Sequence, residues 1–245
     1  MQETKISKTK MAETKTKAMP EVPLRIRIGY ASAAAQEING DIALSCELPD
    51  GRFALILSDG MGKGEQAAAE SRRLVRRLRR NLKKGMAPAH AIKEVNRFMI
   101  RPDRFATMDL ALLDRQHGQV KFYKMGAASS FLVRGGHVKK IEQAALPIGI
   151  VPTLRLTHRT TPLKAGDLIV MVSDGITEAD REDPEADWLQ ELLQKTERET
   201  VANLTPRRLA QQILQEAQQR YACRECDDLT VLVSIVENRP AGKKA

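Results

Sequence analysis

The chain has 245 residues, 42% of them hydrophobic, which is enough for one substantial buried core. It carries 40 Lys and Arg against 31 Asp and Glu, a formal net charge of +9, which ordinarily raises the prospect of a nucleic acid, an acidic membrane or an acidic protein as partner. No apolar run approaches the roughly 20 residues that span a bilayer, the start of the chain lacks a secretory signal, and three cysteines do not form a disulfide framework, so we expect a cytoplasmic location.

Residues 1–22 have few large apolar side chains and no hydrophobic periodicity, which predicts a disordered basic leader. Residues 23–238 are predicted to form one folded domain, and residues 239–245 a flexible tail. The sequence leaves open that the chain is the soluble part of a longer, membrane-anchored protein.

The domain opens with strand-like alternation over residues 25–28. The segment from Asp41 to Leu48 and the apolar run 53–57 then flank a Pro-Asp-Gly turn, which predicts a β-hairpin. In a hairpin centred on Asp50, the numbers of cross-strand partners sum to 100. This places Asp41 opposite Asp59, unless a bulge at Gly51 shifts the register by one residue.

Two helices are predicted next, over residues 65–84 and 88–101. Much of the positive charge lies on the first, which has apolar residues on one side and eight Arg and Lys on the other. This pattern is typical of a core-packed helix with a solvated face, and it also suits docking of an acidic protein partner. We do not expect nucleic acid as a partner, because no aromatic residue lies within the basic run to stack on bases.

The rest of the domain is predicted to consist of further strands and two more helices, without the crossover rhythm of a parallel sheet. The fold class is therefore α+β, with helices covering antiparallel sheets. The strands are expected at 108–113, 120–125, 131–134, 137–141, 154–159, 168–172 and 229–236, and the helices at 184–195 and 206–221.

Four aspartates adjoin apolar β-runs at points where the chain turns: Asp41, Asp59, Asp174 and Asp227. Carboxylates that face each other on one sheet lie about 5 Å apart and repel, so a divalent cation between them is the natural remedy. Oxygen ligands without His favour Mg²⁺ or Mn²⁺. Any one of these positions is also typical of a simple turn, but four together favour a metal site.

The order of several short motifs resembles the metal-dependent type 2C serine/threonine phosphatases, and most of all the bacterial branch typified by stage II sporulation protein E. The resemblance implies an α-β-β-α sandwich, two antiparallel sheets flanked by pairs of helices, with a metal centre at one edge. The motifs are Asn39-Gly40-Asp41, Ser58-Asp59-Gly60-Met61-Gly62-Lys63-Gly64, Leu146-Pro147-Ile148-Gly149, Ala165-Gly166-Asp167, Ser173-Asp174-Gly175 and Asp227-Asp228-Leu229-Thr230-Val231.

The resemblance also implies the role of each residue in a centre of two Mn²⁺ or Mg²⁺ ions. Asp59 is the acid that bridges the ions, and Asp41 and the Gly60 carbonyl hold one of them. Asp174 and Asp227 hold the other, and Asp228 is the less favoured acid of its pair because the family motif has the ligand three positions before the threonine. Asp59 and Asp174 are thus expected to be catalytic through the bound metal and water.

The implied function is hydrolysis of phosphoserine or phosphothreonine on a protein by a metal-activated water. The implied substrate is a phosphorylated anti-sigma factor antagonist in a sporulation or stress pathway. The alternative is a catalytically silent regulatory module of the same fold that docks an acidic partner through helix 65–84. A homodimer is left open. Cys223 and Cys226 form a C-x-x-C pair whose spacing is interpreted as adventitious, since a structural zinc site needs about four ligands.

Overall fold

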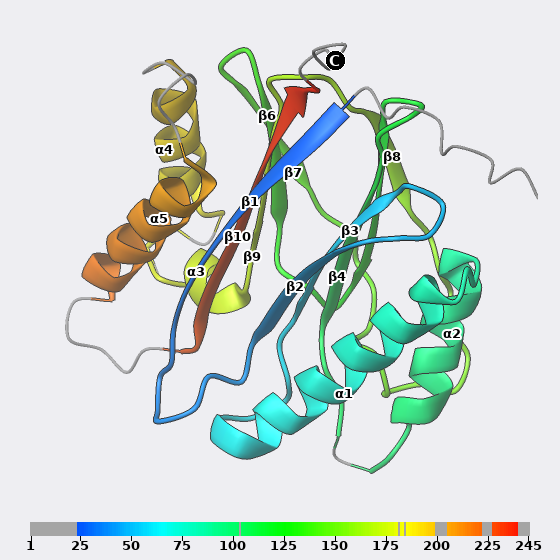
Figure 1. Cartoon of the computed structure of the whole chain (residues 1–245). Helices are drawn as coiled ribbons and strands as arrows, with labels where there is room; N and C mark the ends of the chain where they lie inside the picture. The colour runs from blue at the N-terminus through cyan, green and yellow to red at the C-terminus, as the bar shows by residue number, and fades with distance from the viewer. Residues whose placement is uncertain are drawn as a thin grey trace, which may run out of the picture.

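The computed structural model describes residues 24–102, 104–180, 182–183, 185–198, 205–221 and 227–239. Its described part is an α-β-β-α sandwich of two five-stranded antiparallel sheets with helices on both outer faces, as predicted (Figure 1). The predicted leader lies outside these residues, as do Cys223, Cys226 and all of the predicted tail except residue 239. No helix in the described ranges is long and apolar enough to cross a membrane.

The first sheet, called sheet A here, has the strand order β1-β10-β9-β6-β7. Its first strand in sequence, β1, pairs along its whole length with the last strand, β10, so the two ends of the domain close the same sheet. The strands are β1 (Leu24–Ala33), β6 (Ser130–Arg134), β7 (His137–Ile141), β9 (Leu168–Val172) and β10 (Leu229–Asn238).

The second sheet, sheet B, has the order β2-β3-β4-β5-β8. The register of its first hairpin is the predicted one, because Ile42 pairs with Ser58 and Glu47 with Phe53. Asp41 precedes the first paired residue of one strand, and Asp59 follows the last paired residue of the other. The two aspartates are therefore opposite each other, just beyond the paired residues of the hairpin. The strands are β2 (Ile42–Glu47), β3 (Phe53–Ser58), β4 (Met108–Asp114), β5 (Gln119–Met125) and β8 (Arg159–Pro162).

The predicted strand at 154–159 is wrong, because residues 154–158 have no regular structure and β8 begins at Arg159. Leu154 is buried and Leu156 is partly buried against the core beneath the helices of sheet B. The two leucines alternate with polar residues because an irregular segment packs them against the core, and not because this segment is a strand.

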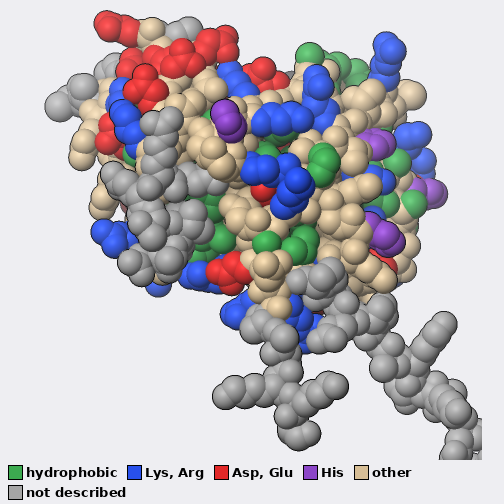
Figure 2. Space-filling view, turned by 90° about the horizontal axis from the view of Figure 1, so that it is seen from above, with side chains coloured by type: hydrophobic (Ala, Val, Ile, Leu, Met, Phe, Trp, Pro, Cys, Tyr) green, Lys and Arg blue, Asp and Glu red, His purple; other side chains and the backbone are tan. Residues whose placement is uncertain are grey.

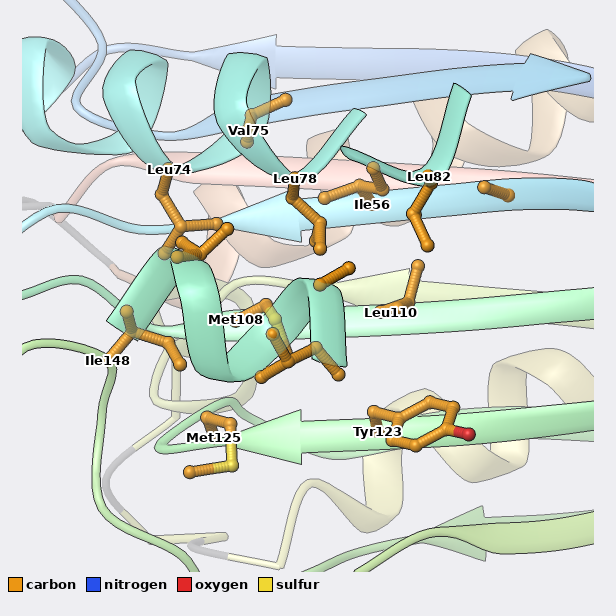
Figure 3. Close-up of a cluster of buried hydrophobic side chains, with 14 of the residues drawn as sticks. Ile56, Leu74, Val75, Leu78, Leu82, Met108, Leu110, Tyr123, Met125 and Ile148 are labelled. Carbon is orange, nitrogen blue, oxygen red and sulfur yellow. The ribbon is translucent and has the colours of Figure 1, made fainter. Parts of the chain in front are cut away.

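Two helices cover sheet B, α1 (Gly64–Lys83) and α2 (Pro88–Met99). The apolar side of α1 packs on β3 and β4, where Leu74, Leu78 and Leu82 meet Ile56 and Leu110 (Figure 3). This confirms the predicted amphipathic helix. Burial of each leucine contributes roughly 1.5–3 kcal/mol relative to exposure.

Three helices lie on sheet A: α3 (Asp174–Thr177), α4 (Asp187–Arg198) and α5 (Pro206–Arg220). The short α3 is not in the predicted elements, and α4 begins three residues later than predicted. Ala186 precedes it with a positive φ of 55°, and the Asp183 carboxylate accepts a hydrogen bond from Trp188 N at 2.9 Å. Trp188 is buried in the core between α4 and the sheet.

The exposed face of α1 carries much of the excess positive charge, but Lys and Arg also spread over the end of the sandwich seen from above in Figure 2. Elsewhere on the described chain, many arginines are paired with carboxylates, among them Arg27 with Glu237 at 2.7 Å, Arg52 with Asp50 at 2.6 Å, and Arg115 with Glu47. The described surface is thus a mixture of paired charges with a concentration of positive charge on α1.

Candidate metal centre

The four predicted aspartates gather where both sheets end, near α3 and the β1–β2 connection in the lower part of Figure 1. Asp41 and Asp59 flank the open end of the β2–β3 hairpin on sheet B. Asp174 follows β9 and Asp227 precedes β10 on sheet A. The site thus depends on the contact between the two sheets.

Asp41 is buried, and neither of its carboxylate oxygens accepts a hydrogen bond within the described residues. Its pKa is raised to about 7, chiefly by burial and further by the charges of Asp174 and Asp228, while the nearby hydroxyls of Ser173 and Thr230 act in the opposite direction. A buried carboxylate without a partner is costly, so this site requires a proton or a cation.

Asp59 is half-buried, and its pKa is raised to about 9. The first cause is burial, and the others are the negative charges of Asp174, of the neighbouring Asp41 and of Asp227. Its backbone is held from both sides by Thr107: Asp59 N donates to Thr107 Oγ1 at 2.9 Å, and Thr107 N donates to Asp59 O at 2.7 Å.

Asp174 is the first residue of α3, and its Oδ1 accepts a hydrogen bond from Gly175 N at 2.8 Å. Burial and the neighbouring Asp227 raise its pKa. Asp227 is exposed. The side chains of Asp174 and Asp227 therefore line the solvent side of the site, while Asp41 lies in its interior.

Asp228 has a different place from Asp227. It is buried, and its carboxylate accepts hydrogen bonds from Ala35 N and Gly40 N, both at 2.8 Å. Both of its oxygens are thus engaged in fixing the β1–β2 connection that leads to Asp41. This agrees with the preference for Asp227 over Asp228 as a metal ligand.

Gly60 lies against the start of α1. A Cβ at this position would come within 2.0 Å of the Ala67 carbonyl oxygen, so only glycine allows the helix to pack this closely. Gly60 also forms a β-bridge with Ala106. The predicted carbonyl ligand is therefore fixed between α1 and the extension of β4.

The donor set fits a hard divalent cation in its chemistry, since all side-chain donors are carboxylates and one buried carboxylate has no partner among the described residues. No group of three or more described His, Cys, Asp or Glu side chains is already arranged to hold an ion. The four histidines, His90, His117, His137 and His158, are all exposed.

A polar groove of about 430 Å³ opens beside Asp174, lined by residues that follow β5, by β7 and by α3. Its charged side chains include Lys140, whose Nζ lies 2.8 Å from the Glu142 carboxylate and 2.6 Å from that of Glu185. Sequence reasoning missed this groove, because its residues come from separate segments of the chain. It also missed a buried ion pair of Lys124 and Asp109, which lie on neighbouring strands but match no motif.

The family model of stage II sporulation protein E matches residues 49–237. Stage II sporulation protein E of Priestia megaterium is 32% identical over 214 residues, which are 86% of this chain and 36% of that protein. The chain thus spans about a third of the length of this curated relative.

Two solved structures are informative. The PP2C phosphatase domain with a fragment of the regulatory domain of SpoIIE from Bacillus subtilis has a TM-score of 0.81 and 31% identity, covering 89% of this chain and 65% of that one. The catalytic domain of the serine threonine protein phosphatase PstP, in complex with two manganese ions, has a TM-score of 0.67 and 17% identity, covering 88% of this chain and 100% of that one. The latter likeness is one of fold.

Proposed function

The chain belongs to the stage II sporulation protein E family, and we propose that it hydrolyses phosphoserine or phosphothreonine on a protein substrate with the help of Mn²⁺ or Mg²⁺. Its fold is that of the metal-dependent serine/threonine phosphatases. The observation that carries the proposal is the meeting of four aspartates from two sheets around Asp59, among them Asp41, a buried carboxylate without a hydrogen-bond partner in the described residues.

The proposed ligands divide between the two sheets. Asp41 and the Gly60 carbonyl would hold one ion, Asp174 and Asp227 would hold a second, and Asp59 would contribute to both. Two observations support this division. Asp41 and Asp59 adjoin each other at the hairpin end, and Asp174 raises the pKa of Asp59 across the gap between the sheets.

When bound, a pair of divalent cations lowers the pKa of a shared water and neutralises charge on the phosphoryl oxygens. Two side chains of the protein hold the segments that carry the proposed ligands Asp59 and Asp41. Thr107 fixes the Asp59 backbone, and Asp228 fixes the chain before Asp41. Both contacts fix the backbone next to a proposed ligand, so they limit the positions that the Asp59 and Asp41 carboxylates can take.

For the physiological substrate we propose a phosphorylated anti-sigma factor antagonist in a sporulation or stress pathway. Support comes from family membership alone, and the chain covers about a third of the curated relative. The alternative is a catalytically silent binding module that docks an acidic partner through the exposed basic face of α1. Retention of all four acids argues against it.

The test is hydrolysis of p-nitrophenyl phosphate and of a phosphoserine protein by the purified chain, with Mn²⁺, with Mg²⁺ and with excess EDTA. We expect turnover only with metal, and loss of at least about 100-fold in Asp59→Ala and Asp174→Ala, because even outer-shell changes cost 10- to 100-fold. Asp50→Ala, an exposed turn aspartate at the other end of the β2–β3 hairpin, is the matched control. Full activity in EDTA, or no turnover with either metal, would overturn the proposal.

A further inference from the structure

A pair of opposite charges is buried between the sheets, close to Asp59 and Asp174. Lys124 on β5 and Asp109 on β4 are direct cross-strand partners, and Lys124 Nζ lies 2.5 Å from Asp109 Oδ2. Each side chain is 1% exposed. Since desolvation offsets much of the attraction in such a pair, an apolar pair of similar volume is often as stable. The pair therefore calls for an explanation other than stability.

The pair connects one sheet to the other. Lys124 Nζ donates a hydrogen bond to Ser130 Oγ at 2.8 Å, and the Ser130 hydroxyl donates to Asp109 Oδ2. Ser130 begins β6 of sheet A, whereas Lys124 and Asp109 belong to sheet B. The three residues, called the inter-sheet link below, are polar in a layer whose other members are mainly apolar, such as Leu57 and Met171.

Each end of the inter-sheet link pairs with a strand that leads to a proposed metal ligand. On sheet B, Asp109 pairs with Leu57, two residues before Asp59. On sheet A, Ser130 pairs with Met171, three residues before Asp174. The link thus sets the separation of the two strands just before they deliver their acids.

A small cavity lies between the inter-sheet link and the aspartates. Its volume is about 10 Å³, which is the lower limit for one water molecule, and its lining includes Asp59, Asp109 and Asp174. Asp109 Oδ1 is buried and has no hydrogen-bond partner in the described part of the chain. The link and the proposed metal ligands therefore share one enclosed space.

We propose that Lys124, Asp109 and Ser130 are positioning residues that fix the spacing between Asp59 and Asp174 and thereby set the affinity for the divalent cation. This inference rests on the proposed function. Directed hydrogen bonds hold two sheets at one separation, whereas an apolar contact tolerates sliding and small changes of distance. The inter-sheet link thus fixes the separation of the two sheets near the proposed metal site, which needs ligands from both sheets.

The test is the double variant Asp109→Leu/Lys124→Met, which removes both charges and keeps similar volume. Mn²⁺ affinity is measured from the electron paramagnetic resonance signal of free Mn²⁺, and folding by circular dichroism and thermal unfolding. We expect a folded protein that binds Mn²⁺ about 10-fold more weakly, the lower end for loss of outer-shell support. An unchanged Kd in the folded variant would overturn the proposal.

The matched control is Arg134→Met/Asp167→Leu, because this is also an ion pair with a buried aspartate but it lies at the other end of β6 and β9, away from the proposed metal ligands. We expect no change in its Mn²⁺ affinity beyond about twofold, even where its stability falls. An equal loss of affinity in the control would mean that general loosening explains the effect, and would overturn the proposal.

Ser130→Ala keeps the ion pair and removes only the hydrogen bonds between the sheets, so it tests the proposal even where the double variant does not fold. We expect Mn²⁺ binding to weaken by about two- to tenfold, the range of the net contribution of a hydrogen bond. Unchanged affinity would overturn the proposed role of the link. A wild-type chain that binds neither Mn²⁺ nor, by calorimetry, Mg²⁺ would overturn the proposed function itself, whereas normal wild-type binding with unaltered variants would overturn only this inference.

Discussion

Each end of the sandwich buries an aspartate, but only one of the two aspartates has hydrogen-bond partners in the described residues. Asp167, before β9, is fully buried, and both of its oxygens are 2.7 Å from the Arg134 guanidinium, while Lys164 N donates to Oδ2 at 2.7 Å. Asp41, before β2, is almost as buried, but neither of its oxygens has a partner in the described residues.

This difference distinguishes an aspartate that stabilises the fold from one that is available for binding. The protein itself satisfies Asp167, so removing its carboxylate leaves a broken ion pair. Asp41 lies unsatisfied among other acids, so its charged form is stable only when a cation supplies the missing interaction. Two buried residues of the same type are thus expected to respond to mutation in opposite ways.

Among the substitutions, the largest expected effect on stability is at the paired end. Asp167→Ala leaves the Arg134 side chain and the Lys164 amide without their partner, and we expect a loss of about 2–4 kcal/mol in the free energy of unfolding, because Arg134 is 36% exposed and stays partly hydrated. Urea unfolding measures it, and Mn²⁺ affinity of the remaining folded protein should be unchanged. Lower Mn²⁺ affinity would show that the two ends are not independent.

The pH dependence of stability also distinguishes the two ends of the sandwich. In the metal-free protein the pKa of Asp41 is about 7 and that of Asp59 about 9, against 3.8 for a free carboxyl, so the folded state binds more protons between pH 4 and 9. Stability should therefore fall as pH rises through this window. The slope is roughly 1.4 kcal/mol per pH unit for each carboxyl that is protonated in the folded state and ionised in the unfolded state.

Urea unfolding at pH 5 and pH 8.5, with EDTA and with saturating Mn²⁺, measures this dependence. Metal competes with protons for the same carboxylates, so Mn²⁺ should remove most of the loss at high pH and should release protons on binding. Stability that rises with pH in EDTA would contradict the raised pKa values.

A smaller effect on stability is expected at the end that holds the unpaired Asp41, and it is a gain of stability rather than a loss. Asp41→Asn removes one of the repelling charges, and its amide can donate to Asp59, so we expect the metal-free fold to be more stable by about 1 kcal/mol at pH 8.5. Mn²⁺ should then raise the melting temperature less than in the wild type, because the variant keeps the proposed ligands of the second ion. Thermal unfolding with and without Mn²⁺ measures both, and a destabilised variant with an undiminished response to Mn²⁺ would contradict this role of Asp41.

The smallest effect is expected away from both ends. Arg76 and Arg80 lie exposed on α1, and replacing both by Ala should change stability by less than about 0.5 kcal/mol and leave p-nitrophenyl phosphate hydrolysis unchanged. Reduced binding of an acidic protein partner in this variant would favour a docking role for the helix. A loss of basal hydrolysis would instead connect this face to the metal site.

Local patterns were sufficient for most of the elements. The alternation around the Pro-Asp-Gly turn predicted the β2–β3 register, and the apolar side of α1 predicted which leucines are buried. The same reasoning failed at residues 154–158, where Leu154 and Leu156 alternate because they pack against the core of sheet B without joining a sheet. Hydrophobic periodicity predicts which side chains are buried, but it does not show whether their segment joins a sheet.

The sequence by itself determined that Asp41 and Asp59 lie side by side, because one short hairpin fixes both, and that α1 has one basic face. Only the tertiary structure decided that Asp174 and Asp227 join them, that Asp228 is engaged with backbone amides, and that Lys124, Asp109 and Ser130 connect the sheets. Contacts within a hairpin follow from local turn geometry, whereas contacts between sheets depend on how distant strands pack across a shared core.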